Sequence, residues 1–315
     1  MKKKSGKEWI DFMTKRNRCP ARPTGLIDVI LDTDAYNEID DQFAIAYLLR
    51  SPEKCRIRAF CAAPFFNSRS TGDVDGMERS YQELQKILKL AHAEEYIPLT
   101  YRGSGFLKDE KTPIASDAAK KIVEIAQEYS AEKPLYVVAI GAITNVASAL
   151  LLDPSIAEKI VIVWLGGHAY HWPKNDEFNL KGDIAAARVV FSSAAPLVQL
   201  PCMGVVDALR TSKPELIHWL HGKNELSTYL CDNTIEAAES YAKGKPWTRV
   251  IWDISTIVWL LDEKCEMMKE KKAPLSMPQY NMEHSISDEN DDICYVWHID
   301  RDKVFEDLFR RLTDK

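Results

Sequence analysis

The sequence predicts an α/β fold in three layers, with an open, mostly parallel sheet covered by helices on both faces. Short apolar runs of strand length alternate with longer segments of helical spacing along most of the chain, which is typical of strand–helix–strand units. The run at 160–165, Ile-Val-Ile-Val-Trp-Leu, is apolar throughout, as expected for a strand that is buried on both faces. No repeat or linker divides the chain, so we expect a single domain at 26–315, preceded by a basic N-terminal arm at 1–25.

The predicted elements follow one another as strand and helix. The first strand ends at Asp32 to Asp34, and a helix begins shortly after Asp41. Gly141 and Gly166 follow two later apolar runs and mark where those strands end. We expect further strands at 56–63, 98–101, 135–140, 160–165, 195–200 and 293–298, helices at 75–90, 117–129, 142–150, 184–191, 214–221, 225–243, 254–261 and 302–312, and loops at 168–179 and 278–292.

Composition and charge exclude several classes of protein. The net charge of −6, with no basic block beyond the first 22 residues, argues against nucleic acid as a partner. No run of 18 apolar residues exists, so no membrane span is expected. Seven cysteines without a C-x-x-C pair favour reduced thiols in a cytoplasmic protein. The basic arm lacks the apolar core of a signal peptide; a docking segment for another subunit is one interpretation, and a solvated terminus is the one we favour.

An acidic stretch follows the first strand. Asp32, Asp34, Glu38, Asp40 and Asp41 place five carboxylates within ten residues, where like charges repel unless something neutralises them. A hard divalent cation is the simplest remedy. Helix capping is an alternative for Asp40 or Asp41, but it does not explain Asp32 and Asp34 at the end of the strand. We therefore favour a metal or catalytic site at the carboxyl ends of the strands.

Other segments place candidate residues at the same edge of the sheet. Asn67 lies in the loop between the second strand and its helix, and the tight corner at Ile140 and Gly141 turns backbone carbonyls towards a ligand. Asp253 precedes an apolar helix, where capping is again the alternative interpretation.

Together these segments resemble the nucleoside hydrolases, the inosine–uridine-preferring N-ribohydrolase superfamily, whose fold is Rossmann-like. No single motif is specific, but the motifs occur in the family order from about residue 26 to 312. The resemblance rests on Leu31-Asp32-Thr33-Asp34 with Asp40-Asp41 and Phe43-Ala44-Ile45-Ala46, on the segment from Ala139 to Ala147, on Leu165-Gly166-Gly167, on Glu177-Phe178-Asn179 and on Asp253.

The resemblance implies a Ca²⁺ ion at the base of a ribose pocket. Its ligands would be the carboxylates of Asp34, Asp41 and Asp253 and the backbone oxygen of Ile140, an oxygen-only set that suits Ca²⁺. Asp32 would orient these ligands. Asp40 would be the general base that takes a proton from the attacking water. The ribose hydroxyls would bind Asn67, Glu177, Asn179, Asp40 and Asp253.

The sequence departs from the family pattern at two places. Five residues, 35–39, separate Asp34 from the Asp-Asp pair where three are usual, and the longer loop carries Asn37 or Glu38 towards the site. Trp252 replaces the histidine that many members carry before the late aspartate, and an indole has no titratable proton at neutral pH. His168 and His171 are the remaining candidates for the acid that protonates the leaving base. Trp252 is expected to form part of the pocket wall or to stack on the base.

The expected function is Ca²⁺-dependent hydrolysis of the N-glycosidic bond of a ribonucleoside or related riboside, giving free base and ribose for purine or pyrimidine salvage. Two alternatives stay open. Leu31-Asp32-Thr33-Asp34 also resembles the first motif of Asp-x-Asp metal-dependent phosphatases. The missing histidine is compatible with a non-catalytic riboside-binding protein that keeps the calcium pocket. The expected partner is the small-molecule riboside, with neither nucleic acid nor membrane, and the family resemblance implies a homo-oligomer, a dimer or tetramer.

Overall fold

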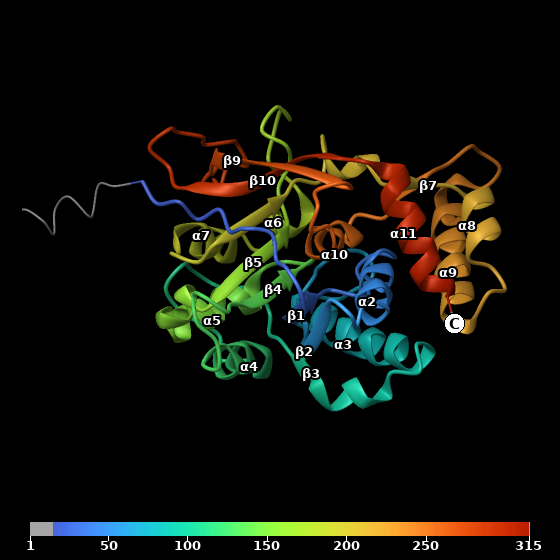
Figure 1. Cartoon of the computed structure of the whole chain (residues 1–315), viewed down its shortest axis with the longest axis horizontal. Helices are drawn as coiled ribbons and strands as arrows, with labels where there is room; N and C mark the ends of the chain where they lie inside the picture. The colour runs from blue at the N-terminus through green and yellow to red at the C-terminus, as the bar shows by residue number, and fades with distance from the viewer. Residues whose placement is uncertain (1–14, 315) are drawn as a thin grey trace, which may run out of the picture.

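A computed structural model describes residues 15–314, which form one eight-stranded sheet with helices on both faces (Figure 1). The strand order is β3-β2-β1-β4-β5-β6-β10-β9, and every neighbouring pair is parallel except β10 and β9. The predicted three-layer, mostly parallel fold is confirmed. The strands of this sheet are β1 (Ile27–Thr33), β2 (Cys55–Ala62), β3 (Thr100–Arg102), β4 (Leu135–Ala139), β5 (Ile160–Leu165), β6 (Leu197–Leu200), β9 (Met268–Pro274) and β10 (Asp292–Ile299).

Two apolar cores lie on the two faces of the sheet. Val29 and Leu31 of β1 point into one core, and Ile30 between them points into the other, because side chains alternate along a strand. The first core is covered by α2 (Asp41–Leu49), α3 (Asp73–Leu90), α8 (Lys213–Trp219), α9 (Glu225–Ala242), α10 (Ile254–Leu261) and α11 (Arg301–Thr313); the second is covered by α4 (Asp117–Ala126), α5 (Thr144–Leu152), α6 (Phe178–Gly182) and α7 (Ile184–Ser192).

Four short or charged elements were not predicted. Strand β9, Met-Lys-Glu-Lys-Lys-Ala-Pro, pairs antiparallel with β10 at the edge of the sheet, where charged side chains reach water. Helix α6 begins inside the predicted loop at 168–179 and is too short, at five residues, to show helical periodicity. A separate antiparallel pair joins β7 (Arg210–Thr211) to β8 (Arg249–Val250).

The described part of the N-terminal arm pairs with the fold from Arg16 onward, in contrast to the solvated terminus that we expected. The Arg18 side chain is 2% exposed and donates to the backbone oxygens of Val190, Phe191 and Ala195. The Arg18 backbone also bonds Asp292, so the arm lies between β6 and β10. The first 14 residues of the predicted arm lie outside the described residues. No helix within 15–314 is both long and apolar enough to cross a membrane.

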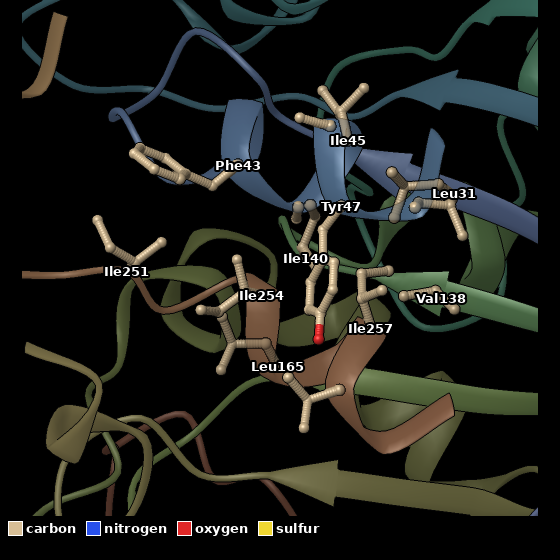
Figure 2. Packing of buried hydrophobic residues seen from close by; sticks show 14 of the residues in the cluster. Leu31, Phe43, Ile45, Tyr47, Val138, Ile140, Leu165, Ile251, Ile254 and Ile257 are labelled. Carbon is tan, nitrogen blue, oxygen red and sulfur yellow. The ribbon is translucent and has the colours of Figure 1, made fainter. Parts of the chain in front are cut away.

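Buried apolar side chains pack together at the carboxyl ends of β4 and β5 (Figure 2). Ile140 and Leu165, at the ends of β4 and β5, are buried with Ile254 and Ile257 of α10 and Phe43 of α2. Charged groups next to these apolar side chains have surroundings of low polarity on one side, which makes unpaired charges costly.

Candidate functional site

A cavity of about 250 Å³ opens at the carboxyl ends of β1, β4 and β5. The loop from β1 to α2 supplies its acidic wall, Ile140 follows β4, and Asp253 precedes α10. This is the edge at which ligands bind in open α/β sheets. The cavity is lined by Asp34, Asn37, Glu38, Asp40, Asp41, Ile140, Leu165, His168, Glu177, Phe178, Asn179, Cys202, Met203, Trp252 and Asp253.

Helix capping does not explain the aspartates of this cavity. Asp40 precedes α2 and Asp253 precedes α10, yet neither side chain accepts a cap hydrogen bond from its helix. Asp41, in the first turn of α2, instead accepts from the Thr33 hydroxyl at 2.5 Å. Side-chain capping is therefore wrong for Asp40 and Asp253, and both residues line the cavity instead.

Four buried carboxylates converge in the cavity. Asp40, Asp41 and Asp253 each offer an oxygen within 4.8 Å of the other two, and both oxygens of Asp34 are buried without a hydrogen-bond partner. Burial, reinforced by the neighbouring carboxylates, raises the pKa of Asp34 and of Asp253 well above the ordinary value. Burial, with Glu38 and Asp41, raises the pKa of Asp40 to about 8, and burial raises that of Asp41 to about 6. A hard divalent cation fits this oxygen-only set.

The corner after β4 brings the backbone of Gly141 close to the Asp34 side chain. A Cβ on Gly141 would lie 2.9 Å from the Asp34 Cγ, so only glycine allows this approach. The Ile140 oxygen accepts from Asn179 Nδ2 at 3.0 Å, and the same amide donates to the Leu165 oxygen at 3.0 Å. Asn179 thereby fixes the ends of β4 and β5 relative to each other.

Asp32 lies behind the cavity instead of lining it. Its Oδ1 accepts from Asn145 Nδ2 at 2.8 Å, and its Oδ2 is buried without a partner. Burial raises the Asp32 pKa to about 7, although the Asn145 hydrogen bond lowers it. Asn145 holds Asp32, and Thr33 holds Asp41. Sequence reasoning selected neither residue, although both lie within motifs that carry the family resemblance.

The opposite wall holds a carboxylate in a different way. Glu177 caps α6 and accepts three backbone N–H groups, from Gly167 at 3.0 Å, Asn179 at 2.9 Å and Leu180 at 2.9 Å. Burial raises the Glu177 pKa, and these N–H groups lower it. The capping bonds place Glu177 and Asn179 together at the rim.

Only one of the two predicted histidines reaches the cavity. His168 lines it, and its Nδ1 accepts from the Met203 backbone N–H at 3.3 Å. Burial lowers the His168 pKa. His171 is exposed and lies outside the lining. Trp252 lines the cavity, and its backbone N–H donates to Asp40 Oδ2 at 3.0 Å.

The five-residue insertion brings Asn37 and Glu38 into the lining. Asn67 is not part of the lining; its Nδ2 donates to Asn37 Oδ1 at 2.6 Å. Glu38 forms an ion pair with Arg249 at 2.5 Å, which ties the insertion to the segment before α10. Sequence reasoning did not select four further lining residues. Leu165 and Phe178 lie within motifs that carry the family resemblance, whereas Cys202 and Met203 had no signal in the sequence.

Comparison with known proteins identifies the family. The family model for inosine-uridine preferring nucleoside hydrolase matches residues 29–306. The non-specific ribonucleoside hydrolase RihC of Salmonella paratyphi B is 28% identical over 261 residues, which cover 76% of this chain and 79% of RihC.

Solved structures share the fold. A plant nucleoside hydrolase superposes with a TM-score of 0.70 at 19% identity, over 94% of this chain and 100% of the plant chain. The purine-preferring ribonucleoside hydrolase from Gardnerella vaginalis gives 0.70 at 19% identity, over 91% and 98%. The match over residues 29–306 covers the sheet, the acidic loop and Asp253. The chain therefore belongs to the inosine-uridine preferring nucleoside hydrolase family.

Proposed function

We propose that this protein uses Ca²⁺ to hydrolyse the N-glycosidic bond of a riboside. The single observation that carries the proposal is the group of buried carboxylates from Asp34, Asp40, Asp41 and Asp253 in the cavity lining, where both Asp34 oxygens lack a hydrogen-bond partner within the described residues. Family membership supports the chemistry of N-ribosyl hydrolysis. It gives no support to the alternative of an Asp-x-Asp phosphatase.

Asp34, Asp41 and Asp253, with the Ile140 backbone oxygen, would hold the Ca²⁺ ion. Bound there, the ion supplies positive charge that neutralises the carboxylates and lowers the pKa of nearby water. The unpartnered oxygens of Asp34 are the feature that fits this role best, because buried carboxylates without donors call for a cation.

Asp40 would act as the general base. The Trp252 backbone N–H holds Asp40 Oδ2 at 3.0 Å, which fixes the carboxylate and leaves Oδ1 to take a proton from the attacking water. Water would attack the anomeric carbon while the bond to the base breaks. The surrounding carboxylates would stabilise the positive charge that develops on the sugar.

The rim residues are poised to accept hydrogen bonds from the ribose hydroxyls. Both amide hydrogens of Asn179 are already donated, to Ile140 and Leu165, so only its Oδ1 is available to a ligand. Glu177 accepts three backbone N–H groups and a carboxylate has about four acceptor positions. Each side chain therefore offers an acceptor to a sugar hydroxyl.

The test is a reducing-sugar assay over a panel of ribosides with Ca²⁺, comparing the wild type with Asp40→Asn. We expect kcat to fall by about 10²–10⁴-fold, the usual contribution of a general base. Calcium affinity, measured by titration calorimetry, should change by less than threefold. Asp288→Asn, at an exposed position, is the matched control and should keep full turnover.

Unchanged turnover in Asp40→Asn would remove Asp40 from the mechanism. Tight ribose binding without release of ribose from any riboside would favour the non-catalytic alternative. Metal-dependent phosphate release that survives loss of Asp253 but not of Asp32 would favour the phosphatase.

A further inference from the structure

His168, the one histidine of the cavity lining, is poorly suited to protonate a leaving base. His168 Nδ1 accepts the Met203 N–H, so the neutral ring carries its proton on Nε2, and a second proton on Nδ1 would break that bond. Burial lowers the His168 pKa, and the charged or titratable groups around it are Asp176, Asp207, Lys181 and His284. The neutral ring offers an N–H donor from Nε2, which lies 3.8 Å from Asp176 Oδ1, and Asp176 partly opposes the effect of burial on the His168 pKa.

Three further lining residues, Trp252, Cys202 and Glu38, are no better suited. The Trp252 indole does not titrate at neutral pH, and burial raises the pKa of the Cys202 thiol well above its ordinary value. Glu38 forms an ion pair with Arg249, and an ionised carboxylate has no proton to give. Expulsion of a neutral purine or pyrimidine normally needs a proton on the base, and a well-placed acid contributes about 10²–10⁴-fold.

The charge of the cavity points in the same direction. Six of the fifteen lining residues are carboxylic acids, and none is Lys or Arg. One divalent cation would leave this wall acidic. Clefts lined by one sign of charge attract ligands of the opposite sign. Trp252 adds an aromatic wall, and the faces of aromatic rings bind organic cations.

We propose that the preferred substrate is a riboside whose leaving base carries a fixed positive charge, such as a pyridinium riboside or an N7-alkylated purine riboside. This inference rests on the proposed riboside hydrolysis. In the reaction, water forms the new bond to the anomeric carbon and passes a proton to Asp40. The electron pair of the breaking C–N bond goes to the ring nitrogen, which becomes neutral. The base therefore leaves without being protonated, and the acid that the cavity lacks is not required.

A matched pair of substrates tests the proposal. Inosine and 7-methylinosine differ by one methyl group and one fixed charge. We expect kcat/KM for 7-methylinosine to exceed that for inosine by at least about 100-fold, the lower end of the effect of general acid catalysis. N-ribosylnicotinamide should exceed uridine similarly. A ratio within threefold for the inosine pair would overturn the proposal.

Two variants separate the cavity's contribution from the intrinsic lability of charged ribosides. Trp252→His places a titratable imidazole in the cavity wall, so the ratio of kcat/KM for 7-methylinosine to that for inosine should fall by at least about tenfold, as general acid catalysis becomes available to inosine. Glu38→Gln removes a lining charge and should raise KM for 7-methylinosine more than KM for inosine. Unchanged ratios in both variants would contradict the proposal.

A neutral substrate with an activated leaving group keeps the two proposals distinguishable. 4-Nitrophenyl β-D-ribofuranoside needs no proton on its leaving group and carries no charge. Its turnover in the wild type and in both variants shows that they fold and hydrolyse ribosides. No turnover of this compound by the wild type would contradict the proposed function, whereas its turnover without a preference for charged bases would overturn only the substrate inference.

Discussion

The two walls of the cavity bury carboxylates equally well but treat their charge in opposite ways. Glu177, on the wall before α6, accepts three backbone N–H groups. Asp34, on the wall after β1, has no hydrogen-bond partner on either oxygen, and Asp40, Asp41 and Asp253 crowd beside it. Fixed backbone dipoles stabilise the first charge within the fold. The carboxylates of the second wall are neutralised only when a cation binds. Folding alone therefore provides partners for the Glu177 carboxylate, whereas the carboxylates around Asp34 need a bound cation.

The largest expected effect separates the two walls by calcium affinity. Asp41→Asn should weaken Ca²⁺ binding by more than about 100-fold, beyond the range seen when supporting residues around a metal are lost. Glu177→Gln should change calcium affinity by less than threefold, yet lower the free energy of unfolding by about 1–3 kcal/mol, because an anionic acceptor of three buried N–H groups is replaced by a neutral one. Titration calorimetry and chemical denaturation measure the two effects. Wild-type calcium affinity in Asp41→Asn would contradict this division of the walls.

The second prediction concerns stability against pH without calcium. Burial raises the folded-state pKa of Asp40 to about 8 and of Asp41 to about 6, from 3.8. The folded protein then binds more protons than the unfolded chain, so the stabilising contribution is fully present below about pH 4 and is lost as the pH rises through about 6 to 8. Each retained proton changes the free energy of unfolding by about 1.4 kcal/mol per pH unit. We expect the Tm in EDTA to fall from pH 5 to pH 8.

Saturating Ca²⁺ should remove or reverse this fall, because it favours the ionised carboxylates. Asp40→Asn provides the control, since its apo Tm should fall less steeply over the same pH range. Equal slopes of Tm against pH for the wild type and Asp40→Asn in EDTA would show that folding does not raise the Asp40 pKa. Glu177→Gln should change the slope by a smaller amount, because three backbone N–H groups oppose the effect of burial on the Glu177 pKa.

The sequence predicts the acidic wall far better than its supports. Parallel strands bring their carboxyl ends to one edge, so residues that follow apolar runs, such as Asp34 and Ile140, can be placed together without a structure. The partner of Asp32 is Asn145, 113 residues away, and only the packing of α5 on the sheet brings the two together. Backbone donors are harder still: the N–H that holds Asp40 belongs to Trp252, but any residue except proline would supply it.

Sequence reasoning missed strand β9 and the burial of Arg18 for the same physical reason. Strand β9 is held by backbone pairing to β10 at the sheet edge, and its charged side chains carry no apolar period. Arg18 is buried because its guanidinium finds three backbone carbonyls, contacts that composition does not encode. The pattern of apolar residues predicts which segments enter the core. Strand β9 and the burial of Arg18 depend instead on backbone hydrogen-bonding groups, which every sequence possesses.

The smallest expected effect concerns Asn67, which the family resemblance assigns to the ribose and the structure places behind Asn37. Asn67 Nδ2 donates to Asn37 Oδ1, and only Asn37 lines the cavity. If Asn67 acts by positioning Asn37, Asn67→Ala should raise KM by about threefold, the order of one neutral hydrogen bond, with little change in kcat. The double variant with Asn37→Ala should then match Asn37→Ala alone, since residues in one contact are not additive. Additive losses, with kcat reduced more than tenfold in Asn67→Ala, would show that Asn67 reaches the sugar directly and that the loop after β2 moves inward when substrate binds.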